Sequence, residues 1–270
     1  MKTATLIGVP YDAKSSFARG PALAPAAIRH ALHSPAGNAY SEFLDNVLSP
    51  ELLRDAGDVK VESDDYPMEG VRLAVHQALG SASVPVVLGG DHSITYAVVR
   101  AVHERVGTFS ILHFDAHNDL YHEFEGDALS HACPFARIME GGHARQLTQV
   151  GIRCPSPHQA EQAQKFSVTV IDMRAWSRGV RPVIEGPCYL SIDLDVLDPA
   201  FAPGLSHREP GGLSTRELLT VIQELPNPLV GVDIVELNPA RDVDGITAGT
   251  AAKILREVVS RILRGDEGDR

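Results

Sequence analysis

Short runs of apolar and often β-branched residues recur along the chain, and each is followed by a more polar segment. Continuous apolar runs of this kind are typical of strands that are buried on both faces, as in a parallel sheet. The sequence therefore predicts a series of short strands. They cover residues 4–9, 84–88, 110–114, 147–151, 167–171, 188–192 and 229–234.

Between these runs the apolar positions follow a helical period instead. Residues 94–102 and 251–263 each place their apolar side chains on one helical face. Ser214 with Glu217 three residues later is a capping-box pattern that begins a third helix, and Pro25 can open a fourth. Alternation of strands and helices predicts a single α/β domain over residues 1–270, with a doubly wound, mostly parallel sheet flanked by helices.

Composition narrows the function classes. The chain has 270 residues and a formal net charge of −11, without a basic patch, so we expect no nucleic-acid partner. Cys133, Cys154 and Cys188 are far apart and form no Cys-x-x-Cys pair, which disfavours a thiolate zinc site and a disulfide framework. No signal peptide and no bilayer-spanning run is apparent. We therefore expect a soluble cytoplasmic protein without a membrane partner.

Chemically active side chains follow four of the predicted strands. Parallel α/β sheets bind ligands at the carboxyl ends of their strands. At these ends the sequence reads Gly-Gly-Asp-His-Ser (89–93), Asp-Ala-His-Asn-Asp (115–119), Asp-Leu-Asp (193–195) and Val-Glu (235–236). In extended backbone, side chains at alternate positions share one face. Asp115, His117 and Asp119 should therefore point the same way, and so should Asp193 and Asp195.

Together these motifs offer two imidazoles and four carboxylates. The set is His92, Asp115, His117, Asp119, Asp193 and Asp195. A carboxylate-rich site with some imidazole suits Mn²⁺ better than thiolate-loving metals. Four crowded carboxylates repel one another strongly unless cations neutralise them. The sequence thus predicts two divalent ions, which bridging carboxylates would hold roughly 3.5–4 Å apart.

Each motif alone also has a structural interpretation. His92 could complete a loop or cap a helix, and the two aspartate motifs could cap turns. The joint occurrence of six ligand-type residues at three strand ends favours the metal site. His131 and Glu236 are open at this level: a histidine can shuttle protons and a carboxylate can hold a guanidinium, but a surface imidazole and a surface ion pair fit as well.

These motifs resemble those of the ureohydrolase family, which comprises arginases, agmatinases and related amidinohydrolases. The resemblance covers nearly the whole chain, from Gly-Val-Pro at 8–10 to Asp-Ile-Val-Glu at 233–236. Residues 125–131, 135–142, 205–212 and 238–242 are similar to the plant-type arginase branch. The resemblance implies an arginase-like three-layer α/β/α fold and a homotrimer or homohexamer.

The resemblance also implies a role for each site residue. His92 and Asp119 would bind the first metal, His117 and Asp195 the second, and Asp115 and Asp193 would bridge them. His131 would be the proton shuttle and Glu236 the guanidinium-binding carboxylate. The site chemistry, apart from the resemblance, makes Asp119 or a similar ligand carboxylate a carrier of the released proton. His207 would be a substrate contact. Asn118 stands where a small residue is more usual in the family; it should point away from the metals and have little effect.

The expected activity is therefore that of a binuclear manganese hydrolase that cleaves the guanidino C–N bond of a small linear compound and releases urea. The acidic loop 120–127 suits an amine better than a carboxylate. This slightly favours agmatine over arginine as the substrate. Guanidinobutyrase and formimidoylglutamase activities are alternatives. More remote ones are a single-zinc deacetylase of the same architecture and a non-catalytic metal-binding assembly protein.

Overall fold

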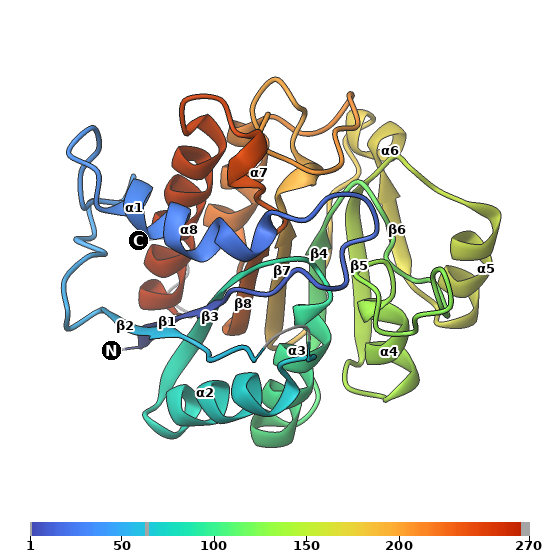
Figure 1. Ribbon diagram of the computed structural model, residues 1–270, viewed down its shortest axis with the longest axis horizontal. Coiled ribbons are helices and arrows are strands. Elements are labelled where there is room, and N and C mark those ends of the chain that lie inside the picture. Colours follow the sequence, from blue (N-terminus) through green and yellow to red (C-terminus); the bar gives the residue numbers. More distant parts are fainter. Residues whose placement is uncertain (1, 63–64, 266–270) are drawn as a thin grey trace.

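The computed structural model describes residues 2–62 and 65–265, which are built around one eight-stranded parallel sheet (Figure 1). The strand order is β2-β1-β3-β8-β7-β4-β5-β6. The strands are β1 (Thr3–Val9), β2 (Leu53–Asp58), β3 (Ser83–Gly89), β4 (Ser110–Phe114), β5 (Gln146–Ile152), β6 (Thr169–Asp172), β7 (Cys188–Asp193) and β8 (Leu229–Val235). The predicted doubly wound parallel sheet is confirmed.

All the predicted strands are present, but two details differ. The strand predicted at 167–171 begins later, at Thr169, because Ser167 adopts a left-handed turn with φ 54°. Strand β2 had no counterpart in the prediction. It lies at the sheet edge, where only Leu53 of its six residues is buried, so its sequence carries no apolar run.

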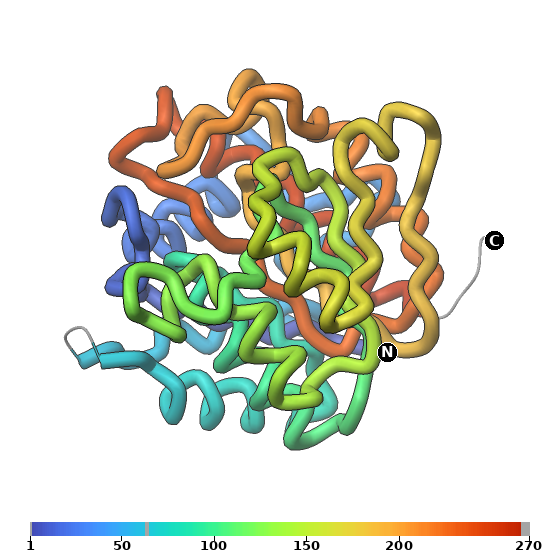
Figure 2. The backbone as a smooth tube through the Cα atoms, turned by 90° about the vertical axis from the view of Figure 1, so that its right-hand side faces the viewer, coloured from blue at the N-terminus to red at the C-terminus, as the bar shows by residue number. Residues whose placement is uncertain are grey.

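Helices cover both faces of the sheet (Figure 1). One face carries α1 (Ala24–Leu32), α6 (Met173–Ser177), α7 (Thr215–Glu224) and α8 (Ile246–Arg264). The other carries α2 (Met68–Gly80), α3 (Ile94–Val106), α4 (Pro134–Glu140) and α5 (Pro157–Lys165). Figure 2 views the molecule from the β6 edge, with the green-to-yellow segment that contains α4 and α5 in front.

The four helices predicted from sequence are confirmed as α3, α8, α7 and α1. The capping box also forms: the Ser214 side chain accepts the Glu217 N–H, and the Glu217 carboxylate accepts the Ser214 N–H. No helix of the described chain is both long and apolar enough to cross a membrane.

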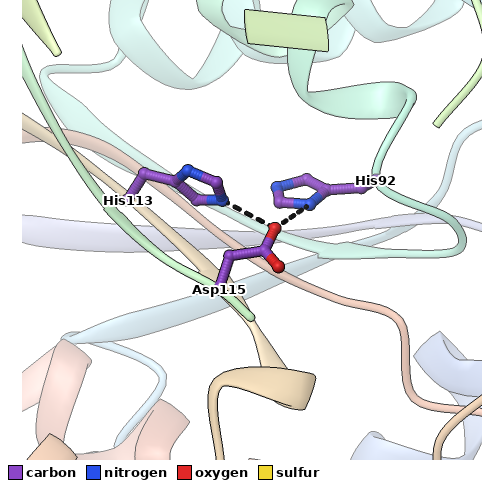
Figure 3. A group of neighbouring side chains, drawn as sticks. All are labelled: His92, His113 and Asp115. Atoms are coloured by element: carbon purple, nitrogen blue, oxygen red, sulfur yellow. Dashed lines mark hydrogen bonds and ion pairs between the residues drawn. The ribbon is translucent and has the colours of Figure 1, made fainter. Parts of the chain in front are cut away.

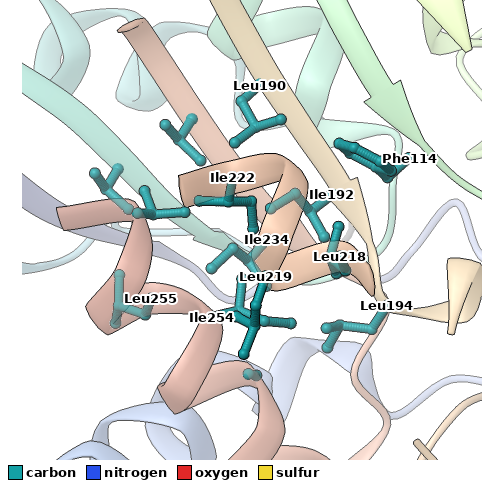
Figure 4. Close-up of a cluster of buried hydrophobic side chains, with 14 of the residues drawn as sticks. Phe114, Leu190, Ile192, Leu194, Leu218, Leu219, Ile222, Ile234, Ile254 and Leu255 are labelled. Carbon is teal, nitrogen blue, oxygen red and sulfur yellow. The ribbon is translucent and has the colours of Figure 1, made fainter. Parts of the chain in front are cut away.

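The hydrophobic core has two parts, one on each face of the sheet. In the part drawn in Figure 4, Leu218 and Ile222 of α7 and Ile254 of α8 pack onto the sheet. They meet Ile192 of β7 and Ile234 of β8, and all five side chains are almost fully buried. Each fully buried side chain of this size contributes about 1.5–3 kcal/mol. Packing of α7 and α8 on this face of the sheet therefore stabilises the central strands β7 and β8.

The sheet order brings the chemically active strand ends together. Strands β3, β8, β7 and β4 are consecutive neighbours in the centre of the sheet, although they are distant in sequence. The four motifs that follow them therefore meet at one edge, as the sequence predicted.

Gly90 allows the end of β3 to lie against the segment after β1. A Cβ on Gly90 would lie 1.6 Å from the carbonyl oxygen of Tyr11. The Gly90 N–H donates to Val9, and the Gly90 carbonyl accepts the N–H of Glu236. Any side chain here would push apart the backbone that positions His92 and Glu236.

We predict that Gly90→Ala destabilises the protein by about 2 kcal/mol or more, because backbone atoms must move to admit the methyl group. The matched control is Gly80→Ala at the end of α2, where a Cβ meets nothing within 4 Å. That change should be neutral or stabilise by up to about 1 kcal/mol. Chemical unfolding of both variants measures the difference; equal stability would contradict the role of Gly90.

Candidate active site

A cavity of about 210 Å³ opens at the carboxyl ends of the central strands. Its lining includes seven of the residues singled out from the sequence: His117, Asp119, His131, Asp193, Asp195, His207 and Glu236. The other two, His92 and Asp115, are fully buried at its base. The structure therefore brings all nine predicted site residues to one place.

His92 stands at the centre of a first group of carboxylates. Its Nδ1 lies 3.2 Å from Asp115 Oδ2, 3.1 Å from Asp119 Oδ2 and 3.2 Å from Asp193 Oδ2. This Nδ1 has no hydrogen-bond partner among the described residues. We call these four side chains the first cradle.

The tautomer of the neutral His92 ring follows from its other nitrogen. Its Nε2 lies 3.0 Å from Ser191 Oγ, and that hydroxyl donates to Asp233 at 2.7 Å. Ser191 must therefore accept, so His92 carries a proton on Nε2, and in its neutral form the ring directs a lone pair from Nδ1 at three carboxylate oxygens. A lone pair facing anions is repulsive, whereas a cation between them satisfies all four groups. The first cradle thus fits a metal ion.

His117 belongs to a second group. Its Nδ1 lies 3.0 Å from Asp195 Oδ2 and 3.3 Å from Asp115 Oδ1. The three side chains place possible ligand atoms within 4.8 Å of one another. We call them the second cradle. Asp115 joins the two cradles, because one of its oxygens faces His92 and the other faces His117.

Asp193 differs from Asp115 in this respect. Its Oδ2 belongs to the first cradle, but its Oδ1 accepts the backbone N–H of Asp195 at 2.8 Å. The expected bridging role of Asp115 agrees with its geometry, while that of Asp193 stays a prediction.

The metal-free cluster carries strong like-charge repulsion. Burial and the neighbouring charges of Asp195 and Asp115 raise the pKa of Asp193 well above its usual range. Burial and Asp115 also raise the pKa of Asp195. The carboxylates in turn raise the pKa of His92, although burial opposes its charge. These groups therefore need positive charge to stay ionised together.

Glu236 and His131 form a pair beside the cradles. Glu236 Oε1 accepts the backbone N–H of His92 at 2.8 Å and lies 2.9 Å from His131 Nδ1. On the far side of the ring, Ser16 directs its N–H and its hydroxyl at His131 Nε2, at 3.1 and 2.8 Å. Burial opposes a charge on the ring, but Glu236 raises the pKa of His131 to about 9. Because the Ser16 N–H can only donate, Nε2 accepts in this arrangement and the ring proton on Nδ1 faces Glu236. A charged ring would lose the Ser16 N–H contact and keep the Ser16 hydroxyl, which can also accept.

Two site residues have an unusual backbone. Asp119 has φ 50° and Glu236 has φ 67°, both in the left-handed region that residues with a side chain rarely adopt. Such conformations persist where the surroundings enforce them and are frequent at functional sites. Here they turn the chain just after β4 and β8 so that both carboxylates face the cavity.

The loop 120–127 does not place its acidic groups in the cavity. Glu123 and Glu125 are exposed to solvent, and Asp127 forms a 2.7 Å ion pair with Lys14. Only Tyr121 and Phe124 of this loop line the cavity. The argument for an amine-ended substrate from the acidity of this loop was therefore wrong, because the charges point outward or are already paired.

Sequence analysis missed the buried polar residues below the cradles. The His113 ring donates a hydrogen bond to Asp115 Oδ2 at 2.8 Å. The Ser191 hydroxyl oxygen accepts a hydrogen bond from His92 Nε2. Both precede a ligand-type aspartate by two positions, so they lie on the same face of their strands. A polar residue two positions before a strand-end aspartate is the signal that could have found them.

A sequence profile of the Arginase family matches residues 2–260 of the chain. The chain belongs to the arginase family. Its relatives include an arginase and an agmatinase. It is 46% identical over 281 residues to the mitochondrial arginase of Medicago truncatula, and this match covers 96% of this chain and 82% of that protein. It is 32% identical to the agmatinase of Bacillus subtilis (strain 168), with 95% and 90% covered.

The solved structure of the arginase from Medicago truncatula has the same fold. It matches with a TM-score of 0.89 and 43% identity, and the match covers 97% of this chain and 87% of that chain. The resemblance to the ureohydrolases and their plant-type branch is thus confirmed. As a member of the arginase family, a group of binuclear metal-dependent hydrolases, this protein acts on C–N bonds of guanidino compounds. The remote alternatives of a single-zinc deacetylase and a non-catalytic protein lose their support.

We predict that Asp193→Asn lowers the number of bound Mn²⁺ ions per chain from two to one or none. The change keeps the shape of the side chain but removes a negative oxygen from the first cradle, so affinity should fall by about 10²-fold or more. Elemental analysis of protein equilibrated with limiting Mn²⁺ measures it. Asp65→Asn, on an exposed residue before α2, is the control. Full metal loading of Asp193→Asn would contradict the assignment.

Proposed function

We propose that this protein hydrolyses L-arginine to urea and ornithine with two Mn²⁺ ions. One observation carries the proposal: a single cavity joins two carboxylate–imidazole cradles to a separate buried carboxylate, Glu236. The cradles suit two divalent cations, and the remaining carboxylate suits the guanidinium of the substrate.

The donor set supports manganese in particular. Oxygen ligands outnumber nitrogen ligands, and no thiolate belongs to either cradle, which favours Mn²⁺ over softer metals. His92, Asp119, Asp115 and Asp193 would hold the first ion, and His117, Asp195 and Asp115 the second. When bound, the two cations lower the pKa of a water molecule enough for it to attack a carbon atom near neutral pH.

Glu236 would hold the guanidinium by charge-assisted hydrogen bonds. Its Oε1 is occupied by the His92 N–H and by His131, whereas its Oε2 has no bond to another described residue. The attacked carbon becomes bonded to the water oxygen, and its bond to the side-chain nitrogen of the substrate then breaks. His131 in its charged form would give a proton to this leaving nitrogen, while Asp119 would accept the proton that the water loses.

Uncommitted hydrogen-bonding groups at the cavity support arginine rather than agmatine. Arginine carries an α-carboxylate that agmatine lacks. Gln159 accepts the Leu120 N–H through Oε1, which leaves its amide N–H groups for a ligand. His207 Nε2 is buried without a partner among the described residues and belongs to a cavity-lining ring. The higher identity to a plant arginase than to an agmatinase points the same way.

His207 would therefore contact the substrate. Its ring lies edge-on to Phe17, His117 and His131, with ring centroids 5.6 Å apart in each case, so it closes the cavity over the metal and proton-transfer groups.

Guanidinobutyrate and formiminoglutamate stay as alternative substrates. The homotrimeric or homohexameric assembly and the cytoplasmic location stay predictions of the sequence.

We predict that Mn²⁺-loaded protein releases urea from arginine with a kcat/KM at least about tenfold above that for agmatine. This ratio corresponds to about one hydrogen bond to a charged group. A urea assay with both substrates measures it. A ratio in favour of agmatine would overturn the choice of substrate and leave the reaction class intact. Two bound ions without urea from either compound would overturn the proposed reaction.

We predict that Glu236→Gln lowers kcat/KM for arginine by roughly 10²-fold or more, because an amide cannot supply the negative charge that pairs with the guanidinium. The same variant should still bind two Mn²⁺ ions, since Glu236 belongs to neither cradle. Steady-state kinetics and metal content, measured on the same preparation, separate these effects. Loss of both ions together with activity would contradict the substrate-binding role.

A further inference from the structure

A row of buried polar side chains crosses the sheet one level below the cradles. In the strand register His113 on β4 lies beside Gln149 on β5 and beside Ser191 on β7, and Ser191 lies beside Asp233 on β8. All four side chains are fully buried. The Ser191 and Asp233 half of the row orients His92, as described above. The other half leads to Asp115.

The orientation of the Gln149 amide is fixed by its neighbours. Gln149 Nε2 lies 2.6 Å from the backbone carbonyl of Asn118, which can only accept. The nitrogen must therefore be on that side, and Gln149 Oε1 accepts from Asn118 Nδ2 at 2.8 Å. Asn118 thus binds both ends of the amide group.

This orientation determines the proton position on His113. Gln149 Nε2 also lies 3.0 Å from His113 Nδ1 and can only donate to it. His113 Nδ1 must then accept, and the proton of the neutral ring is on Nε2. That nitrogen donates to Asp115 Oδ2 at 2.8 Å. In Figure 3 the rings of His113 and His92 both point at this one oxygen.

The same reasoning decides whether His113 is itself a ligand. Its Nε2 lies in a group with His92 and Asp115 whose ligand atoms are all within 4.8 Å. However, a nitrogen that carries a proton has no lone pair for a metal. His113 therefore acts on Asp115 and not on the cation.

We propose that His113 is a positioning residue that holds Asp115 as the bridge between the two metal ions, and that Gln149 and Asn118 keep His113 in the required tautomer. The inference rests on the proposed two-ion centre. It adds three residues, none of which touches the substrate or an ion.

The geometry of Asp115 explains why a bridge needs this support. Oδ1 accepts the backbone N–H of His117 at 2.5 Å, and Oδ2 accepts His113. Each oxygen thus has one protein donor, and a further lone pair of each faces one cradle. With a donor on both oxygens the carboxylate plane cannot rotate. With only one donor, both oxygens could turn toward the same ion, and the other ion would lose a ligand.

The expectation for Asn118 is corrected in this light. Its side chain does point away from the cradles, as the sequence predicted. It is nevertheless buried, at 3% exposure, and it is bonded to Gln149. Asn118 therefore belongs to the hydrogen-bonded chain that ends at Asp115, so the expected lack of effect does not hold under this proposal.

Two substitutions of His113 test the proposal. His113→Phe keeps the ring that stacks on Phe135, at 3.9 Å between centroids, but removes the donor. We expect the more weakly held Mn²⁺ to bind about 10–100-fold less tightly. His113→Gln can place an amide N–H near the position of Nε2 and should restore affinity close to the wild-type value. Electron paramagnetic resonance of free Mn²⁺ during titration measures affinity and stoichiometry without any activity assay.

Each outcome is decisive. Wild-type affinity in His113→Phe would show that Asp115 needs no donor, and equal losses in His113→Phe and His113→Gln would indicate a ligand or packing role. Either result overturns the proposal. The stoichiometry of the unmodified protein and its urea release test the proposed function separately, since they do not depend on the variants.

Gln149→Met tests the outer part of the chain and is a second route if His113→Phe fails to fold. Without its donor to Nδ1, the ring of His113 is no longer held in one tautomer, so Mn²⁺ affinity should fall in the same direction. The double variant His113→Phe/Gln149→Met should lose no more than His113→Phe alone, because Gln149 acts through His113. Wild-type affinity in Gln149→Met, or additive losses in the double variant, would contradict the proposed order of action.

Discussion

The structure depends on the neutralisation of buried negative charge. Asp115, Asp119, Asp193 and Asp195 converge around His92 and His117 in a part of the protein with little solvent access. Burial of one unpaired carboxylate is costly, and burial of several next to one another is prohibitive unless cations join them. In its neutral form His92 directs the lone pair of Nδ1 at three carboxylate oxygens, an arrangement that a metal ion between the four groups satisfies. The fold around the site holds these charged side chains in place.

The parallel sheet supplies the frame. Its order places the ends of β3, β8, β7 and β4 side by side, and the helices on both faces keep these strands buried and rigid. Gly90 permits close approach of backbone at the end of β3, and the left-handed conformations of Asp119 and Glu236 turn carboxylates into the cavity. Below the ligand-type residues, the polar row of Gln149, His113, Ser191 and Asp233 fixes proton positions. The site is therefore built in two levels, one that faces the cavity and one that orients it.

Sequence patterns revealed the upper level and missed the lower one. Buried parallel strands are recognisable because both faces demand apolar residues, and alternate spacing predicts which strand-end side chains share a face. Strand β2 was not predicted because an edge strand is largely exposed and does not need an apolar run. His113 and Gln149 escaped because a lone polar residue inside an apolar run gives no indication of its partner on the neighbouring strand. The acidity of loop 120–127 does not support the preference for agmatine, because the charge of a loop sequence does not indicate where its side chains point: Glu123 and Glu125 face solvent, and Asp127 is paired with Lys14.

The central claim is that two cations share Asp115, and diffraction tests it most directly. Crystals of the Mn²⁺-loaded protein, measured on both sides of the manganese absorption edge, would locate each ion independently of any assumption about ligands. The account predicts two anomalous peaks roughly 3.5–4 Å apart, one beside His92 and Asp119 and the other beside His117 and Asp195, with Asp115 between them. A single peak, or two peaks of which only one lies within reach of Asp115, would contradict it.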